Sequence, residues 1–136
     1  MSSPVHLDKE SGRAASGVPI RVAERELDER TVEVAVAGEL DLATAPHLKW
    51  PLLDALRAGR TNLLVNLAQV TFIDSTALSV LVGVKRKLPI SARMALVCTN
   101  ESVLRIFTIA GLDGVFAIFP SVEAALAYLQ GDSDRH

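Results

Sequence analysis

Hydrophobic positions change their spacing along the chain. Residues 18–27 and 31–37 alternate apolar and polar side chains, which is typical of β-strands, and the polar residues 28–30 between them predict a tight turn. A nearly continuous apolar run at 62–67 follows. It predicts a central strand that is covered on both faces.

Beyond the first strands, helical and strand patterns alternate. Four predicted helices lie between residues 44 and 59 and over 75–88, 101–110 and 121–129, with further strands over 93–99 and 115–119. Thr44 and Ser121 are the expected caps of the first and last helices. Pro51 lies inside the first helix, where it removes a hydrogen bond, so we expect a kink there or a helix that becomes regular only after it.

These elements predict an α/β fold of order β-β-α-β-α-β-α-β-α. Repeated strand-helix-strand units imply a mixed, mostly parallel sheet of about five strands with about four helices, and the first hairpin adds an antiparallel edge. Residues 1–17 and 131–136 are small or polar and are predicted to be disordered tails. Residues 18–130 are then expected to form one folded domain.

The chain carries 14 basic and 16 acidic residues with no basic block, which argues against nucleic acid as a direct partner. The single cysteine, Cys98, cannot form an internal disulfide, and its apolar neighbours predict a buried residue. No stretch reaches the roughly 18 apolar residues that span a bilayer. Residues 1–17 also lack the apolar core of a secretory signal, so we expect a cytoplasmic protein without a membrane span.

Catalytic residues are difficult to assemble from this sequence. The histidines at positions 6, 47 and 136 have no metal-ligand spacing, and Cys98 has no partner cysteine. There is no glycine-rich phosphate loop, and Ser75 lacks the setting of a nucleophile elbow. We therefore expect a binding protein rather than an enzyme, with no cofactor and no metal.

The most informative feature is the junction at 73–78, where an apolar strand ends and Asp74, Ser75 and Thr76 open an amphipathic helix. A helix start leaves backbone N–H groups unpaired and carries partial positive charge, which suits a capping side chain or an added phosphate. Either Asp74 or Ser75 can cap this helix. An ordinary cap and a phosphorylation site at Ser75 are both compatible with the pattern.

The helix that follows has two stripes at helical spacing. One is apolar and is expected to be buried. The other is small and polar with one cation, and consists of Thr76, Ser79, Gly83 and Arg86. Small residues let a partner approach closely, so this stripe is a candidate docking face together with Asp74. The alternative is an ordinary solvated helix face.

A second candidate is the segment 38–41, Gly-Glu-Leu-Asp, predicted as a loop. Its acids, Glu39 and Asp41, are either simply solvated or lie at the same rim as Ser75 and contact a partner. A phosphate at Ser75 would add about −1.5 to −2 charges. The helix start tolerates that charge, so we expect it to repel a partner and the nearby acids, including Asp74, without unfolding the domain.

Several motifs in order resemble one family. Residues 38–41, the Val-Asn-Leu of 65–67, the Phe-Ile-Asp-Ser-Thr-Ala-Leu of 72–78 and the stretch 104–112 resemble the STAS-domain anti-sigma factor antagonists. The likeness extends over about residues 18–130 and implies the STAS fold. Ala77 stands where many relatives carry glycine, a change that favours the helix.

The resemblance implies partner switching. Such a protein binds an anti-sigma factor that is also a serine kinase of the histidine-kinase-like ATPase fold, and binding releases the sigma factor. The kinase phosphorylates the serine after the motif aspartate, here Ser75, which ends binding, and a serine phosphatase restores it. The alternative within the family is a STAS subunit of a membrane transport complex, which docks an ATPase without phosphorylation.

Overall fold

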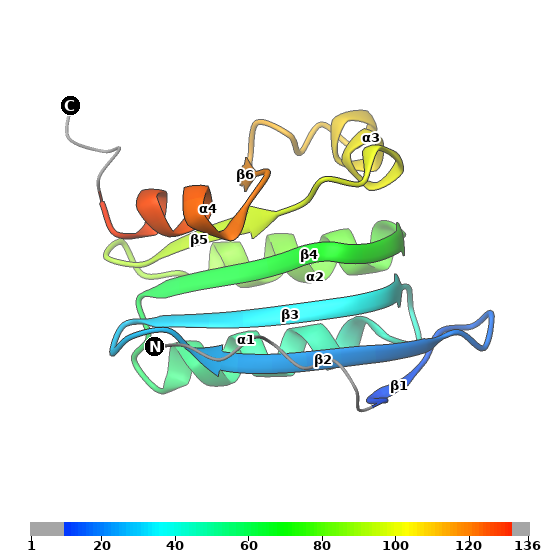
Figure 1. Ribbon diagram of the computed structural model, residues 1–136, viewed down its shortest axis with the longest axis horizontal. Helices are drawn as coiled ribbons and strands as arrows, with labels where there is room; N and C mark the ends of the chain where they lie inside the picture. The colour runs from blue at the N-terminus through cyan, green and yellow to red at the C-terminus, as the bar shows by residue number, and fades with distance from the viewer. Residues whose placement is uncertain (1–9, 132–136) are drawn as a thin grey trace.

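The computed structural model describes residues 10–131 as a six-stranded sheet with four helices (Figure 1). The remaining parts of the predicted tails, 1–9 and 132–136, lie outside the described residues. The strands are Gly12–Arg13 (β1), Pro19–Glu26 (β2), Thr31–Leu40 (β3), Asn62–Ile73 (β4), Arg93–Val97 (β5) and Ala117–Phe119 (β6). The helices are Ala45–Arg57 (α1), Ser75–Arg86 (α2), Glu101–Ile109 (α3) and Val122–Leu129 (α4).

The strands lie in the sheet in chain order. β1, β2 and β3 pair antiparallel, whereas β3, β4, β5 and β6 pair parallel. The mixed, mostly parallel sheet and the order of the elements from β2 onward are as predicted. β1 is an addition, because it lies inside the segment 1–17 that the sequence predicted to be a tail. Its Gly12 and Arg13 pair with Ile20 and Pro19.

The predicted loop at 38–41 is wrong, since β3 continues to Leu40. Glu39 and Leu40 pair with Phe72 and Ile73 of β4, past irregularities in the register. Gly38 makes this possible with a φ of 120°, and a Cβ built on it would lie 2.7 Å from the backbone oxygen of Pro19. Glycine is therefore required where β2 and β3 approach each other so closely.

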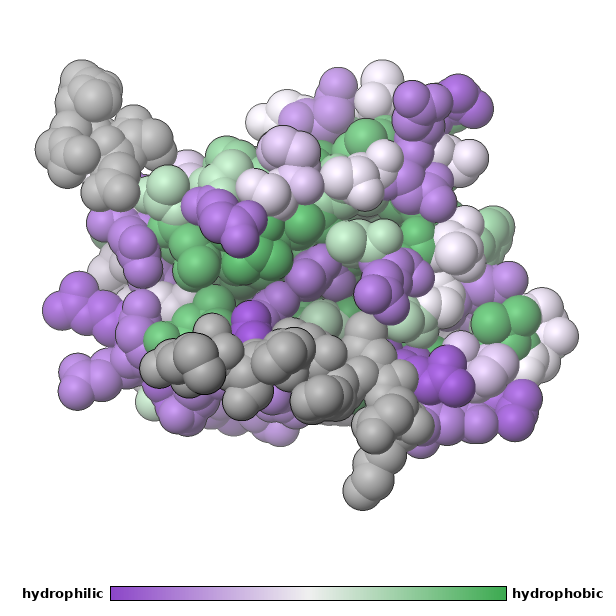
Figure 2. Space-filling view, in the orientation of Figure 1, coloured by the Kyte–Doolittle hydropathy of each residue, from purple (hydrophilic) through white to green (hydrophobic). Residues whose placement is uncertain are grey.

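The two faces of the sheet carry different helices (Figure 1). The larger core lies between one face and α1, α2 and α3, and it includes Leu63 and Val65 of β4. On the other face, α4 packs Ala125 and Leu129 against Leu64. Figure 2 shows hydrophobic residues grouped over α4 and β5 on that side. Residues 62–67 of β4 are thus covered on both faces, as their apolar run predicted.

Helix α1 runs without interruption from Ala45 to Arg57, so the expectation of a helix that is regular only after Pro51 is wrong, and a kink at Pro51 stays a prediction. Trp50 beside it is 50% exposed and lies under the ammonium group of Lys49, 5.2 Å from the ring centre. The tryptophan side chain therefore lies at the surface of α1. Cys98, by contrast, is buried as predicted, and burial raises the pKa of its thiol.

Candidate functional site

The junction between β4 and α2 lies at the carboxyl edge of the parallel strands, to the right in Figure 1. The carboxylate of Asp74 accepts hydrogen bonds from the N–H groups of Thr76 and Ala77, at 2.9 and 3.1 Å. Asp74 is therefore the cap of α2. Ser75 is the first helical residue, and its side chain is exposed. The cap leaves the hydroxyl of Ser75 free for other chemistry.

Helix α2 presents two different faces. The face toward the core buries Ala77, Leu78, Leu81 and Val84. The other face carries the predicted docking stripe: Ser79 and Arg86 are exposed, and Thr76 and Gly83 are half-buried. Ser75 lies at the start of this face. A partner that contacts the stripe would therefore also reach the Ser75 hydroxyl.

The two acids of segment 38–41 differ in their surroundings. Glu39 is half-buried, whereas Asp41 is buried, with 8% of its surface exposed. The Asp41 carboxylate accepts hydrogen bonds from the backbone N–H groups of Ala15 at 2.8 Å, Ala43 at 2.9 Å and Thr44 at 3.1 Å. These bonds give Asp41 a structural role, and its contact with a partner stays a prediction.

The Ala15 N–H, joined by the other two, lowers the pKa of Asp41 below its ordinary value and outweighs the opposing effect of burial. A depressed carboxyl pKa contributes stability above the pKa of the unfolded chain, near 4, and loses it as pH falls through the folded value. We therefore expect Asp41→Asn to reduce the free energy of unfolding by about 1–3 kcal/mol at pH 7. Urea unfolding from pH 7 to pH 2.5 measures this difference, which should shrink below about pH 4.

Asp54→Asn is the matched control, because the Asp54 side chain is 68% exposed and pairs with Arg57 on the surface of α1. It should change stability by less than about 0.5 kcal/mol. An Asp41→Asn deficit of the same size at every pH would contradict the assigned ionisation.

A hollow of about 520 Å³ lies beside the junction, lined by Ala15, Ser16, Glu39, Asp41, Leu42, Phe72 and Asp74. Two of its apolar side chains reach solvent, with Leu42 74% and Phe72 49% exposed. Sequence reasoning missed both residues. No local pattern marks them, because Phe72 lies between Thr71 and Ile73 in the apolar run that ends at the junction, and Leu42 is a single leucine after Asp41.

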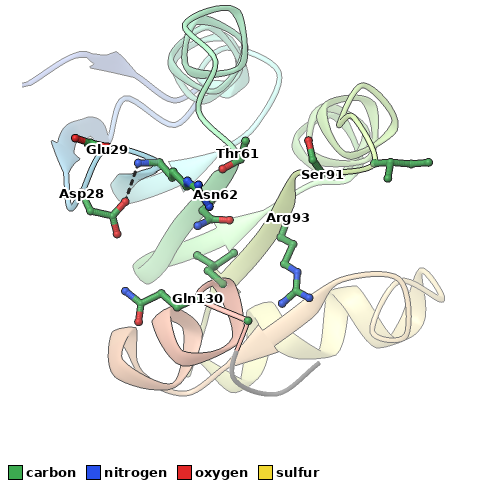
Figure 3. Close-up of a pocket in the computed structure, with 11 residues that line it drawn as sticks. Asp28, Glu29, Thr61, Asn62, Ser91, Arg93 and Gln130 are labelled. Carbon is green, nitrogen blue, oxygen red and sulfur yellow. Dashed lines mark hydrogen bonds between the residues drawn. The ribbon is translucent and has the colours of Figure 1, made fainter. Parts of the chain in front are cut away.

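A larger hollow of about 680 Å³ lies at the opposite end of the sheet and contains none of the predicted site residues (Figure 3). Its lining is mostly polar. The Asp28 carboxylate there accepts hydrogen bonds from the N–H groups of Arg30 and Thr31, which shapes the turn between β2 and β3. Arg93 donates to the backbone oxygen of Tyr128. These contacts hold turns and α4 in place.

Comparison with known proteins agrees with this architecture. The STAS domain family matches residues 23–125, so the chain belongs to that family. An anti-sigma-B factor antagonist of Staphylococcus epidermidis is 34% identical over 92 residues, which cover 67% of this chain and 85% of that protein.

Two solved proteins share the fold. An anti-sigma factor antagonist of Mycobacterium paratuberculosis has a TM-score of 0.77 at 24% identity, covering 87% of this chain and 98% of that one. The unphosphorylated form of the anti-sigma factor antagonist SpoIIAA has a TM-score of 0.70 at 22% identity, covering 81% and 96%. Its phosphorylated form, from Bacillus, has a TM-score of 0.62 at 21% identity, covering 79% and 97%. Within residues 10–131 of this chain, no helix is long and apolar enough to cross a membrane.

Proposed function

We propose that this protein is an anti-sigma factor antagonist whose binding is switched off by phosphorylation of Ser75. It would act by binding an anti-sigma factor, which fits the names of its relatives as antagonists of anti-sigma factors. The observation that carries the proposal is the placement of Ser75. Its side chain is exposed at the first position of α2, directly after Asp74, which has already capped the helix.

The cap decides what a phosphate at Ser75 would do. Asp74 already occupies the N–H groups of Thr76 and Ala77, so a phosphate would not need to bind them to stabilise the helix. It would instead add about −1.5 to −2 charges next to the Asp74 carboxylate, on the face that meets a partner. The expected consequence is repulsion of the partner with the fold intact.

The proposed docking face consists of Asp74, Thr76, Ser79, Gly83 and Arg86, with Glu39 at the rim. The proposed partner is an anti-sigma factor that is also a serine kinase of the histidine-kinase-like ATPase fold, with a serine phosphatase that reverses the modification. In this scheme the protein is a cytoplasmic binding module, and its hydroxyl is the substrate of another enzyme. A half-buried glycine and small hydroxyl side chains on α2 suit a closely packed contact.

The test is phosphate transfer from ATP by the cognate kinase. We expect the wild-type protein to incorporate about one phosphate and Ser75→Ala to incorporate none, because the acceptor oxygen is removed. Ser91→Ala is the matched control, since Ser91 is an exposed serine at the opposite end of the sheet, outside the docking face. It should be phosphorylated like the wild type.

Undiminished incorporation in Ser75→Ala would overturn the assignment of the acceptor. The alternative of a transport-complex subunit predicts a different result. An ATPase partner would bind, and no phosphate would be transferred to the wild type or to Ser75→Ala. Intact-mass spectrometry distinguishes these outcomes.

A further inference from the structure

We propose that the turn at residues 14–17, which joins β1 to β2, forms one wall of the partner-binding site and helps to select the anti-sigma factor. This inference rests on the proposed function and extends it. The turn lies outside residues 23–125, where the chain matches its family. It contacts the motif acids Asp41 and Glu39.

Hydrogen bonds hold the turn against the acids Asp41 and Glu39. The N–H of Ala15 donates to the buried Asp41 carboxylate at 2.8 Å, and the hydroxyl of Ser16 donates to Glu39 at 2.7 Å. Within the turn, the N–H of Ala14 donates to the oxygen of Val18, and the N–H of Gly17 to the oxygen of Ala14, both at 2.8 Å. A partner would therefore meet a preformed wall.

The strand β1, which leads into this turn, is also held in place by α1. An added Cβ on Gly12 would lie 2.6 Å from Nε2 of His47 in α1. The His47 imidazole therefore packs directly on the backbone of β1. The role of His47, an isolated histidine in the sequence, is thus to support β1.

The hollow beside the turn can hold one apolar side chain of a partner together with a charged group next to it. Leu42 and Phe72 offer exposed apolar surface inside the hollow. Glu39 and Asp74 line the same hollow, and neither forms an ion pair with a basic residue within 10–131. The occupant that fits is a segment of the anti-sigma factor that presents one apolar side chain next to a lysine or arginine.

This arrangement also connects the hollow to the switch. Asp74 belongs both to the hollow and to the cap that precedes Ser75. A phosphate at Ser75 would compete with Glu39 and Asp74 for the partner's cation and draw it out of the hollow, and the apolar side chain beside that cation would lose its position. The turn at residues 14–17 and a phosphate at Ser75 would therefore act on the same segment of the partner.

The test is the affinity of the anti-sigma factor, measured by calorimetry, for variants of the full chain. Ala15→Arg keeps the backbone N–H that binds Asp41 and fills the hollow with a cation of its own, so we expect binding about tenfold weaker. Ala110→Arg is the control, because Ala110 is exposed at the end of α3 and lies outside the hollow. It should bind within about twofold of the wild type.

Leu42→Ala supplies a second variant that removes apolar surface without adding bulk, and we expect about fivefold weaker binding. Ile90→Ala is its control, since Ile90 is fully exposed at the opposite end of the sheet. Thermal unfolding checks that all four variants remain folded.

Ser75→Glu, measured together with these variants, tests the wall at residues 14–17 separately from the docking face on α2. If Ser75→Glu loses binding while Ala15→Arg and Leu42→Ala bind like the wild type, the wall is wrong and the docking face on α2 stands. If all three bind like the wild type, the proposed function of this edge is wrong. Dimerisation of the protein alone that Leu42→Ala abolishes would overturn the choice of occupant.

Discussion

The Ser75→Glu variant is expected to bind the anti-sigma factor at least about tenfold more weakly than the wild type, without a loss of folding stability. The added carboxylate lies at the start of α2 next to Asp74, on the exposed face of the helix. A partner that covers it must desolvate a second negative charge beside the first. The helix start favours that charge in the free protein by about 0.3–1 kcal/mol, which offsets the repulsion from Asp74.

Ser75→Gln is the matched control, because it adds nearly the same volume without the charge. We expect it to keep most of the affinity, and both variants to unfold within about 1 kcal/mol of the wild type. Equal losses of affinity in the two variants would mean that bulk, and not charge, controls the contact. Wild-type affinity in Ser75→Glu would contradict a charge-operated switch.

The second large effect concerns the buried face of α2. Leu81 is fully buried in the main core, and Leu81→Ala is expected to lower the free energy of unfolding by about 2–5 kcal/mol. The truncated side chain leaves a cavity that the surrounding helices and sheet fill only in part. Because the docking face points the other way, the folded fraction should keep its affinity within about twofold. Urea unfolding and calorimetry below the unfolding transition measure the two quantities.

Ser79→Gln on the exposed face of α2 should show the reverse. Its stability is expected to stay within about 0.5 kcal/mol of the wild type, while the larger side chain lowers affinity about fivefold. If Leu81→Ala lost affinity and Ser79→Gln did not, the faces of α2 would be assigned the wrong way round.

Local sequence signals were sufficient for most of the fold. The apolar run of β4 predicted a strand covered on both faces, and the predicted cap Ser121 is the observed cap of α4, accepting a hydrogen bond from the N–H of Ala124 at 3.1 Å. These features depend on residues close together in the chain. Spacing and capping chemistry are enough to predict such features.

Features that depend on distant partners were not predictable. β3 extends to Leu40 because β4 offers it hydrogen-bonding partners there, and β1 exists because β2 does. Asp41 and Ala15 are 26 residues apart, so no local pattern indicates that one holds the other. The hollow follows from the same long-range contact, which is why sequence reasoning found Glu39 and Asp74 but missed Leu42 and Phe72.

The central claim is that a phosphate at Ser75 switches partner binding on an unchanged fold. Its most direct test is the affinity of one anti-sigma factor for two samples of this protein, unmodified and phosphorylated by its kinase, with thermal unfolding of both. We expect the phosphorylated sample to bind at least about a hundredfold more weakly and to unfold within a few degrees of the unmodified one. Equal affinities would contradict the claim, as would lost binding that is explained by unfolding.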